Sequence, residues 1–221
     1  MRIIILPLIF FLSATIFLGS CSNVYAQSAT DIGQSQIHPA HSLYFLKTVR
    51  EILELKFAGS DRIASLRRME FATRRIREVK ALVNVQKEEL IAPTLEKYGA
   101  LLKDIIGTTN ITEKELSTQL GESIDNHLNA LYLVYGIISN ADAKRSIRLT
   151  VHRLADLNSE FIERALEHEQ MINVVNLRRA RQTMVCEFLQ REASSSTLNQ
   201  VEQGVYLKRA SSCYKVLEAF K

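Results

Sequence analysis

Few residues in this chain have the types and spacing that metal or nucleophilic chemistry needs. The five histidines are His38, His41, His127, His152 and His168. None belongs to a Glu-x-x-His pair, the arrangement through which helical bundles hold carboxylate-bridged metals. The chain also has no G-x-S-x-G, H-E-x-x-H or P-loop glycine pattern. We therefore expect no catalytic residue, no metal and no cofactor, and we predict that the protein is not an enzyme.

The best-defined chemistry is expected at Cys21, near the start of the chain. Met1 and Arg2 precede an apolar run over residues 3–19, a pattern typical of an export signal. The following residues Leu18–Cys21 look like the lipobox of bacterial lipoproteins, in which the cysteine becomes the lipid-bearing N-terminus. Plain cleavage after Ala26 and an uncleaved anchor are the alternatives. Each of the three outcomes places the folded part outside the cytoplasm.

Two further cysteines, Cys186 and Cys213, are candidates for a disulfide, because an exported chain meets an oxidising environment. Two straight antiparallel helices around a loop near residues 193–198 would leave the pair out of register by roughly 10 Å, which is beyond disulfide reach. A helix break near Gly204 or Ser211–Ser212 would bring them together. The sequence leaves both outcomes open.

Residues 62–80 form a strongly basic segment, with seven cationic and two acidic side chains. One interpretation is a docking face for an anionic envelope polymer or lipid headgroups. The residues expected to form it are Arg67, Arg68, Arg74 and Arg75. The alternative is a solvated helix face on which Glu70, Arg74 and Glu78 pair with one another.

These residues must be positioned by helices, because no strand-like alternation persists anywhere. Hydrophobic residues make up 47% of the 221 residues and charged residues 24%, and the chain has only 8 Gly and 3 Pro. Apolar positions at spacings of three and four predict the following helices: 42–57, 61 to about 83, a segment kinked or newly started at Pro93 and ending at Gly107, 112–138, 140 to about 191 with a break near Met171, and one or two short helices after a loop over 192–197. In the first helix the apolar face is Leu43, Leu46, Val49, Ile52 and Leu53. The predicted fold is all-α, an elongated antiparallel bundle of five to seven helices.

The expected organisation has three parts. Residues 1–20 are the signal peptide, and the polar residues 21–40 are a flexible tether. Residues 41–221 form a single helical domain, since a chain of 221 residues is long enough for one sizeable domain or at most two small ones.

Two motifs near the start of the domain, together with the segment Leu55–Arg62 between them, resemble a family of exported bacterial helical domains of unknown function. The first follows the pattern P-x-x-x-L-Y-x-x-K and is formed here by Pro39, Leu43, Tyr44 and Lys47, with Glu51 four residues further on. The second follows the pattern A-x-x-R-x-x-E and is formed by Ala72, Arg75 and Glu78. The resemblance covers about residues 39–83. It implies a helical extracytoplasmic module behind a signal or anchor, and it implies no reaction.

The spacing inside these motifs indicates ion pairs. Lys47 and Glu51 are four residues apart, and Arg75 and Glu78 are three apart, so each pair can lie on one helix face. Tyr44 combines an apolar ring with a polar tip, which suits the mouth of a helical hairpin. We expect these residues to hold helix to helix, with direct partner contact as the alternative.

The predicted function is a membrane-tethered, extracytoplasmic helical interaction or scaffold module without catalysis. Its partners would be the membrane, through a lipid anchor, and an unidentified envelope protein or anionic polymer. The net charge of +4 is too balanced to indicate nucleic acid, and the oligomeric state is left open. The alternative is a soluble secreted or periplasmic protein acting as an envelope stress chaperone, although the L-T-x-x-Q motif of small exported holdases is absent.

Overall fold

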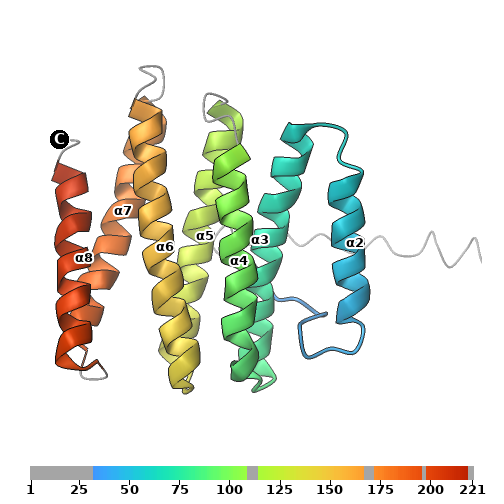
Figure 1. Ribbon diagram of the computed structural model, residues 1–221, viewed down its shortest axis with the longest axis horizontal. Helices are drawn as coiled ribbons and strands as arrows, with labels where there is room; N and C mark the ends of the chain where they lie inside the picture. Colours follow the sequence, from blue (N-terminus) through green and yellow to red (C-terminus); the bar gives the residue numbers. More distant parts are fainter. Residues whose placement is uncertain (1–31, 109–113, 167–171, 196–197, 219–221) are drawn as a thin grey trace, which may run out of the picture.

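The described residues form seven α-helices in a double row, in which α3, α5 and α7 lie behind α4, α6 and α8, with α2 at one end of the row and α8 at the other (Figure 1). The computed structural model describes residues 32–108, 114–166, 172–195 and 198–218. The elements are α2 (Tyr44–Lys56), α3 (Asp61–Asn84), the short 3-10 helix η1 (Glu88–Leu90), α4 (Ile91–Thr108), α5 (Lys114–Ile137), α6 (Ala141–Leu166), α7 (Ile172–Ala193) and α8 (Gln200–Glu218). No strand occurs in these ranges, and the predicted all-α bundle is confirmed.

Several helix starts have a local physical cause. The Ser60 hydroxyl accepts a hydrogen bond from the Ile63 amide at 3.3 Å and caps α3. Asn140 caps α6 by accepting from the Ala143 amide at 2.9 Å. At α8, Asn199 accepts from the Glu202 amide, and the Glu202 carboxylate accepts from the Asn199 amide, which is a reciprocal capping box.

Of the two alternatives predicted at Pro93, a kinked helix or a new one, the structure shows a new helix. Gln86 adopts a positive φ of 56° after α3, and the chain turns through η1 into α4. Pro93 is the third residue of α4, where its missing amide proton costs no helical hydrogen bond. The predicted break near Met171 falls on a residue outside the described ranges, as do the signal segment and Cys21.

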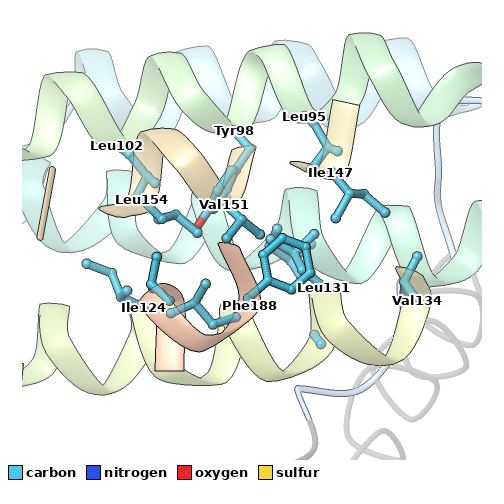
Figure 2. Close-up of a cluster of buried hydrophobic side chains, with 14 of the residues drawn as sticks. Leu95, Tyr98, Leu102, Ile124, Leu131, Val134, Ile147, Val151, Leu154 and Phe188 are labelled. Atoms are coloured by element: carbon cyan, nitrogen blue, oxygen red, sulfur yellow. The ribbon is translucent and has the colours of Figure 1, made fainter. Parts of the chain in front are cut away.

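The core runs along the middle of the row and receives buried apolar side chains from every helix from α3 to α8. Figure 2 shows the part of it where α4, α5, α6 and α7 meet. Apolar side chains at the predicted three- and four-residue steps point into it, among them Ile147, Val151 and Leu154 of α6, all fully buried. Tyr98 of α4 is also fully buried, so its hydroxyl needs an internal partner. None of the helices in the described ranges is both long and apolar enough to cross a bilayer.

The predicted apolar face of α2 is not part of this core. α2 packs mainly against α3 and has no fully buried residue, and Lys97 of α4 places its Nζ 5.3 Å from the centroid of the Tyr44 ring. Its apolar side chains Leu43, Leu46, Val49, Ile52 and Leu53 are instead between 47% and 60% exposed. They share one helix face, as predicted, and this face points away from the bundle because the polar side of α2 makes the contact with α3.

Part of the predicted tether is packed against the domain. Ile32 is buried, its carbonyl accepts a hydrogen bond from the Arg77 side chain, and the Ser35 amide donates to the Arg77 carbonyl at 3.4 Å. The Lys47 ammonium donates to the Ile37 carbonyl at 3.0 Å. Residues 32–37 therefore belong structurally to the α2–α3 end of the domain.

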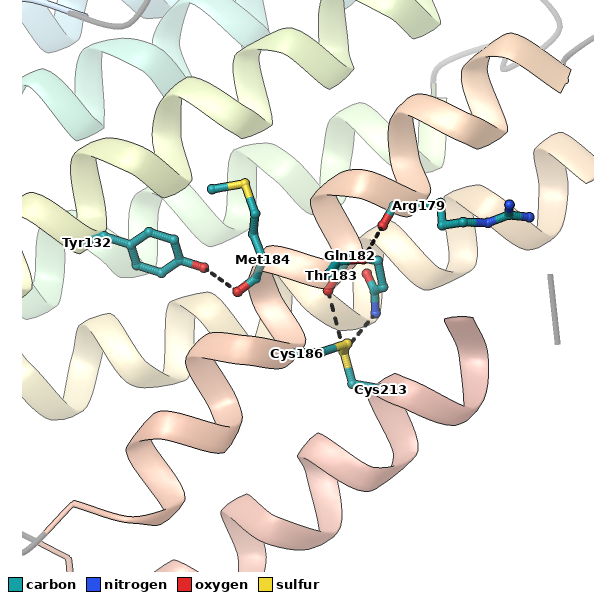
Figure 3. Close-up of a disulfide and its surroundings, with 7 residues drawn as sticks. All are labelled: Tyr132, Arg179, Gln182, Thr183, Met184, Cys186 and Cys213. Atoms are coloured by element: carbon teal, nitrogen blue, oxygen red, sulfur yellow. Dashed lines mark hydrogen bonds between the residues drawn. A yellow bond between two sulfur atoms is a disulfide. The ribbon is translucent and has the colours of Figure 1, made fainter. Parts of the chain in front are cut away.

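Cys186 of α7 and Cys213 of α8 are joined by a disulfide, with their Cα atoms 5.5 Å apart (Figure 3). The predicted misregister does not prevent the bond. Cys186 lies seven residues before the end of α7 and Cys213 thirteen after the start of α8, an offset of six residues or about 9 Å. The six-residue connection 194–199 can span up to about 20 Å and takes up this offset. α8 is continuous, so the suggested break at Gly204 or Ser211–Ser212 is absent.

Candidate functional site

The motif residues come together where α2 lies against α3. Tyr44, Lys47 and Glu51 recur at steps of three and four and share the inner face of α2. Arg75 and Glu78 of α3 face them. We call these five residues the junction network.

Glu78 is the centre of the junction network. Its side chain is 0% exposed, and its carboxylate receives Lys47 Nζ at 2.6 Å and Arg75 Nη1 at 3.0 Å. The Tyr44 hydroxyl donates to the same carboxylate at 3.2 Å. The Arg75 guanidinium also donates to the Tyr44 hydroxyl and pairs with Glu51 of α2. One buried carboxylate thus holds two cations and a phenol from two helices.

Burial and neighbouring charges shift the pKa values of two members of the junction network, Tyr44 and Glu51. Burial, reinforced by the Glu78 carboxylate, raises the pKa of Tyr44 far above its ordinary value. Tyr44 therefore stays protonated and serves as a hydrogen-bond donor. Burial also raises the pKa of Glu51, and the neighbouring Arg75 opposes that shift. Tyr44 and Glu51 are both engaged by partners within the junction network.

A second set of ion pairs surrounds the junction network. Arg74 of α3 approaches Glu51 at 3.5 Å and Glu54 at 3.7 Å, and pairs with Glu70 of its own helix at 3.2 Å. Glu54 in turn receives Arg50 at 2.5 Å. The two acidic residues of α2 are therefore turned toward α3, with side chains only 12% and 18% exposed.

A cavity of about 490 Å³ opens beside this network. Its wall is formed by the packed segment Gln34–Ile37, by the apolar residues Leu43 and Leu46, and by cationic residues from both helices. Those cations are Lys47, Arg50, Arg74 and Arg77, and no carboxylate is among the described residues that line the cavity. We call this cavity the cationic pocket.

The opposite side of α2 is an apolar surface. Beside the five residues of the predicted face, Phe45 is 62% exposed and Phe57, just after the helix, is 76% exposed. These seven side chains, Leu43, Phe45, Leu46, Val49, Ile52, Leu53 and Phe57, form what we call the α2 apolar face. A monomeric soluble protein seldom leaves so many large apolar side chains together in water, and such patches mark interaction sites.

Most of the predicted family-motif residues meet in the junction network, with one change of partner. Lys47 pairs with Glu78 of the other helix, and the structure records no pair with Glu51. Ala72 is fully buried in the core, and Pro39 lies in the turn before α2.

The predicted docking face of Arg67, Arg68, Arg74 and Arg75 is not one exposed surface. Arg67 is exposed, whereas the side chain of Arg74 is 15% exposed and that of Arg75 only 4%. The prediction that all four would meet a partner is wrong, because α2 covers two of them and supplies their carboxylate partners. The alternative of a solvated face with a Glu70–Arg74 pair holds in part.

Sequence reasoning did not single out the roles of Arg50, Arg77 and residues 34–37. Arg77 was one cation among seven, and its bond to the Ile32 carbonyl depends on a segment predicted to be a tether. The signal that could have found it is the apolar Ile32 and Ile37 within an otherwise polar stretch.

His127 is a buried histidine in the core, and both of its ring nitrogens lie within hydrogen-bond distance of a hydroxyl group. Its Nδ1 lies 3.1 Å from the Tyr98 hydroxyl and its Nε2 lies 2.9 Å from the Thr73 hydroxyl. Burial, with a smaller contribution from Arg77, lowers the pKa of His127 to about 3, so the ring is neutral. The described residues include no group of three or more His, Cys, Asp or Glu side chains able to hold a metal ion.

Comparison with known proteins gives one match. The family described as "Domain of unknown function (DUF5667)" matches residues 36–205, far beyond the 39–83 of the motifs. No curated protein and no solved structure matches the chain.

Proposed function

The chain belongs to the DUF5667 family of domains of unknown function, and from this premise we propose that it is a non-catalytic, membrane-tethered helical interaction module. Its site of action is the extracytoplasmic side of a membrane. A lipid on Cys21 anchors it, and the helical domain follows after a short linking segment.

The α2 apolar face is the observation that carries this proposal. Burying a large aliphatic or aromatic side chain typically gains about 1.5–3 kcal/mol, so leaving seven of them half-exposed forfeits several kcal/mol of folding free energy. The junction network holds the opposite side of α2 in place and keeps the apolar side outward. A surface maintained at such a cost is best explained by a binding partner.

A photo-crosslinking amino acid at Val49 in the native cell tests this function. Val49 lies in the middle of the α2 apolar face and is 49% exposed. We expect the probe to capture a specific neighbour in the envelope fraction. The matched control is the same probe at Val205 of α8, which is also 49% exposed but lies at the other end of the row (Figure 1). Equal, diffuse labelling from both sites would refute an interaction role for α2.

The anchor has a separate test, the intact mass of the protein isolated from its envelope. A diacylglyceryl adduct on Cys21 is the expected result. A start at Gln27 without an adduct would contradict the lipid tether and would favour a soluble exported protein.

An envelope chaperone is the alternative supported by the same exposed side chains. The α2 apolar face is the outer side of a single helix, however, and not an enclosed cradle for an unfolded client. An assay of client aggregation at near-equal stoichiometry separates the two functions, because only a chaperone should suppress aggregation there.

A further inference from the structure

We propose that the α2 apolar face and the cationic pocket beside it together form a docking site for the surface of an anionic phospholipid bilayer. This inference rests on the proposed membrane tether and specifies what α2 meets. The argument uses the charges that α2 exposes, the position of the pocket and the place where the described chain begins.

The charges exposed by α2 are of one sign. Its two exposed charged residues are the cations Arg50 and Lys56, while both carboxylates, Glu51 and Glu54, are turned toward α3. An apolar helix face flanked by cations is typical of helices that lie in the interface of an anionic membrane. A second copy of the same face would instead bring cations against cations. The charge pattern therefore favours lipid over self-association.

The cationic pocket continues the α2 apolar face. Leu43 and Leu46 belong to both, so a phosphate group in the pocket would place its acyl chains beside exposed leucines. The cations of the pocket already have carboxylate partners within the fold, for example Lys47 with Glu78 and Arg50 with Glu54. The pocket therefore suits a weakly held, exchangeable headgroup at a surface.

The described chain begins at this end of the molecule. Ile32 lies against α3 and is followed by residues 34–37 in the wall of the pocket. Cys21 is eleven residues before Ile32, a stretch that spans at most about 40 Å. A lipid on Cys21 would thus keep the bilayer within reach of α2, the first helix in the row (Figure 1).

Tryptophan fluorescence tests the docking directly, because the natural chain contains no Trp. The full-length protein, reconstituted through its own anchor into vesicles, carries a single Ile52→Trp substitution in the α2 apolar face. The matched control is Leu207→Trp on α8, at a side chain of similar exposure, 54% against 60%. Vesicles contain either phosphatidylcholine alone or phosphatidylcholine with phosphatidylglycerol, and both are prepared with and without brominated acyl chains.

We expect the Trp at position 52 to emit at shorter wavelength and to be quenched by brominated chains in the anionic vesicles, while the Trp at position 207 is unaffected. Adding Arg50→Gln and Lys56→Gln should lower the ratio of docked to undocked α2 about 25-fold, at roughly fivefold per cation near the surface. Added free inorganic phosphate should not displace α2 from the vesicles. Displacement would show that a soluble anion, and not the bilayer, is the ligand.

Beside displacement by phosphate, three outcomes overturn the proposal. The first is a Trp at position 52 that stays water-exposed, and the second is equal quenching in zwitterionic and anionic vesicles. The third is a blue shift that grows with protein density and is insensitive to brominated lipid, which would indicate a second copy. If any of these occurs while the probe at Val49 still captures one specific protein in cells, the bilayer inference fails and the interaction function stands. If that probe captures nothing, the proposed function fails as well.

Discussion

Replacing Glu78 by glutamine should release α2 from the rest of the domain. The substitution preserves the size of the side chain and removes the one carboxylate that Lys47, Arg75 and Tyr44 share. Those partners would remain in a site where the side chain of residue 78 has no solvent exposure. The junction network would then carry an uncompensated buried cation.

The magnitude follows from the burial of the pair. Removing one partner of a buried ion pair costs about 3–5 kcal/mol when the structure cannot relax. Relaxation is available here, because α2 has no fully buried residue and packs mainly against one helix, α3. Undocking α2 would return Arg75 and Lys47 to water. We therefore expect the substitution to shift the docking equilibrium of α2 by roughly two to three orders of magnitude, with little effect on the other helices.

Amide hydrogen exchange measures this local opening. Amides of α2 should lose protection in the Glu78→Gln protein, while those of α4 and α6 should change by less than about threefold. The matched control is Glu96→Gln on the exposed side of α4, which should leave exchange unchanged and stability within about 0.5 kcal/mol. Adding Lys47→Met to Glu78→Gln removes one surplus cation and should restore part of the protection.

Wild-type protection of α2 in the Glu78→Gln protein would refute this reasoning. The ion pairs would then be incidental to the docking of α2. A uniform loss of protection in α3, α4 and α6 would also contradict it, because that result would make Glu78 a determinant of the whole core.

Three further predictions concern other parts of the bundle. Burial lowers the pKa of His127 to about 3, from about 6.5 in the unfolded chain, so its stabilising contribution is complete above pH 6.5 and is lost as the pH falls. This one group should account for about 2 kcal/mol of the stability lost between pH 7.5 and pH 5 in urea unfolding. Burial also lowers the pKa of His152, to about 4, which adds a loss of the same sign, so His127→Gln should reduce the slope without abolishing it, whereas His41→Gln should leave it unchanged. Cys213→Ser should lower the free energy of unfolding by about 3.5 kcal/mol, because it opens a loop of 27 residues. The urea midpoint should fall and should no longer respond to reductant. A midpoint equal to that of the oxidised wild type would show that the bond adds no stability. Gly204→Ala should stabilise α8 by about 1 kcal/mol, because alanine has the higher helix propensity and nothing lies within 4 Å of the added methyl group. Thermal unfolding at a lower temperature than the wild type would count against a regular helix there.

Most helices were predictable because their signals are local. Apolar steps of three and four, a capping serine before α3 and an asparagine before α6 depend only on neighbouring residues. The junction network was predictable in membership, since Tyr44, Lys47, Arg75 and Glu78 stood in two recognisable motifs. Its pairing was not predictable, because the Lys47 ammonium reaches across to another helix in preference to the glutamate one turn further along its own.

The sequence alone determined which residues share a helix face, and it thereby determined the all-α class of the fold. Only the tertiary structure decided where each face points. The apolar face of α2 looks outward and the charged face of α3 looks inward, because the buried carboxylate of Glu78 gathers cations from both helices. The disulfide depended in the same way on the path between α7 and α8, whose length sets the register. Periodicity is a property of one helix, whereas orientation and register are set by the contacts between helices.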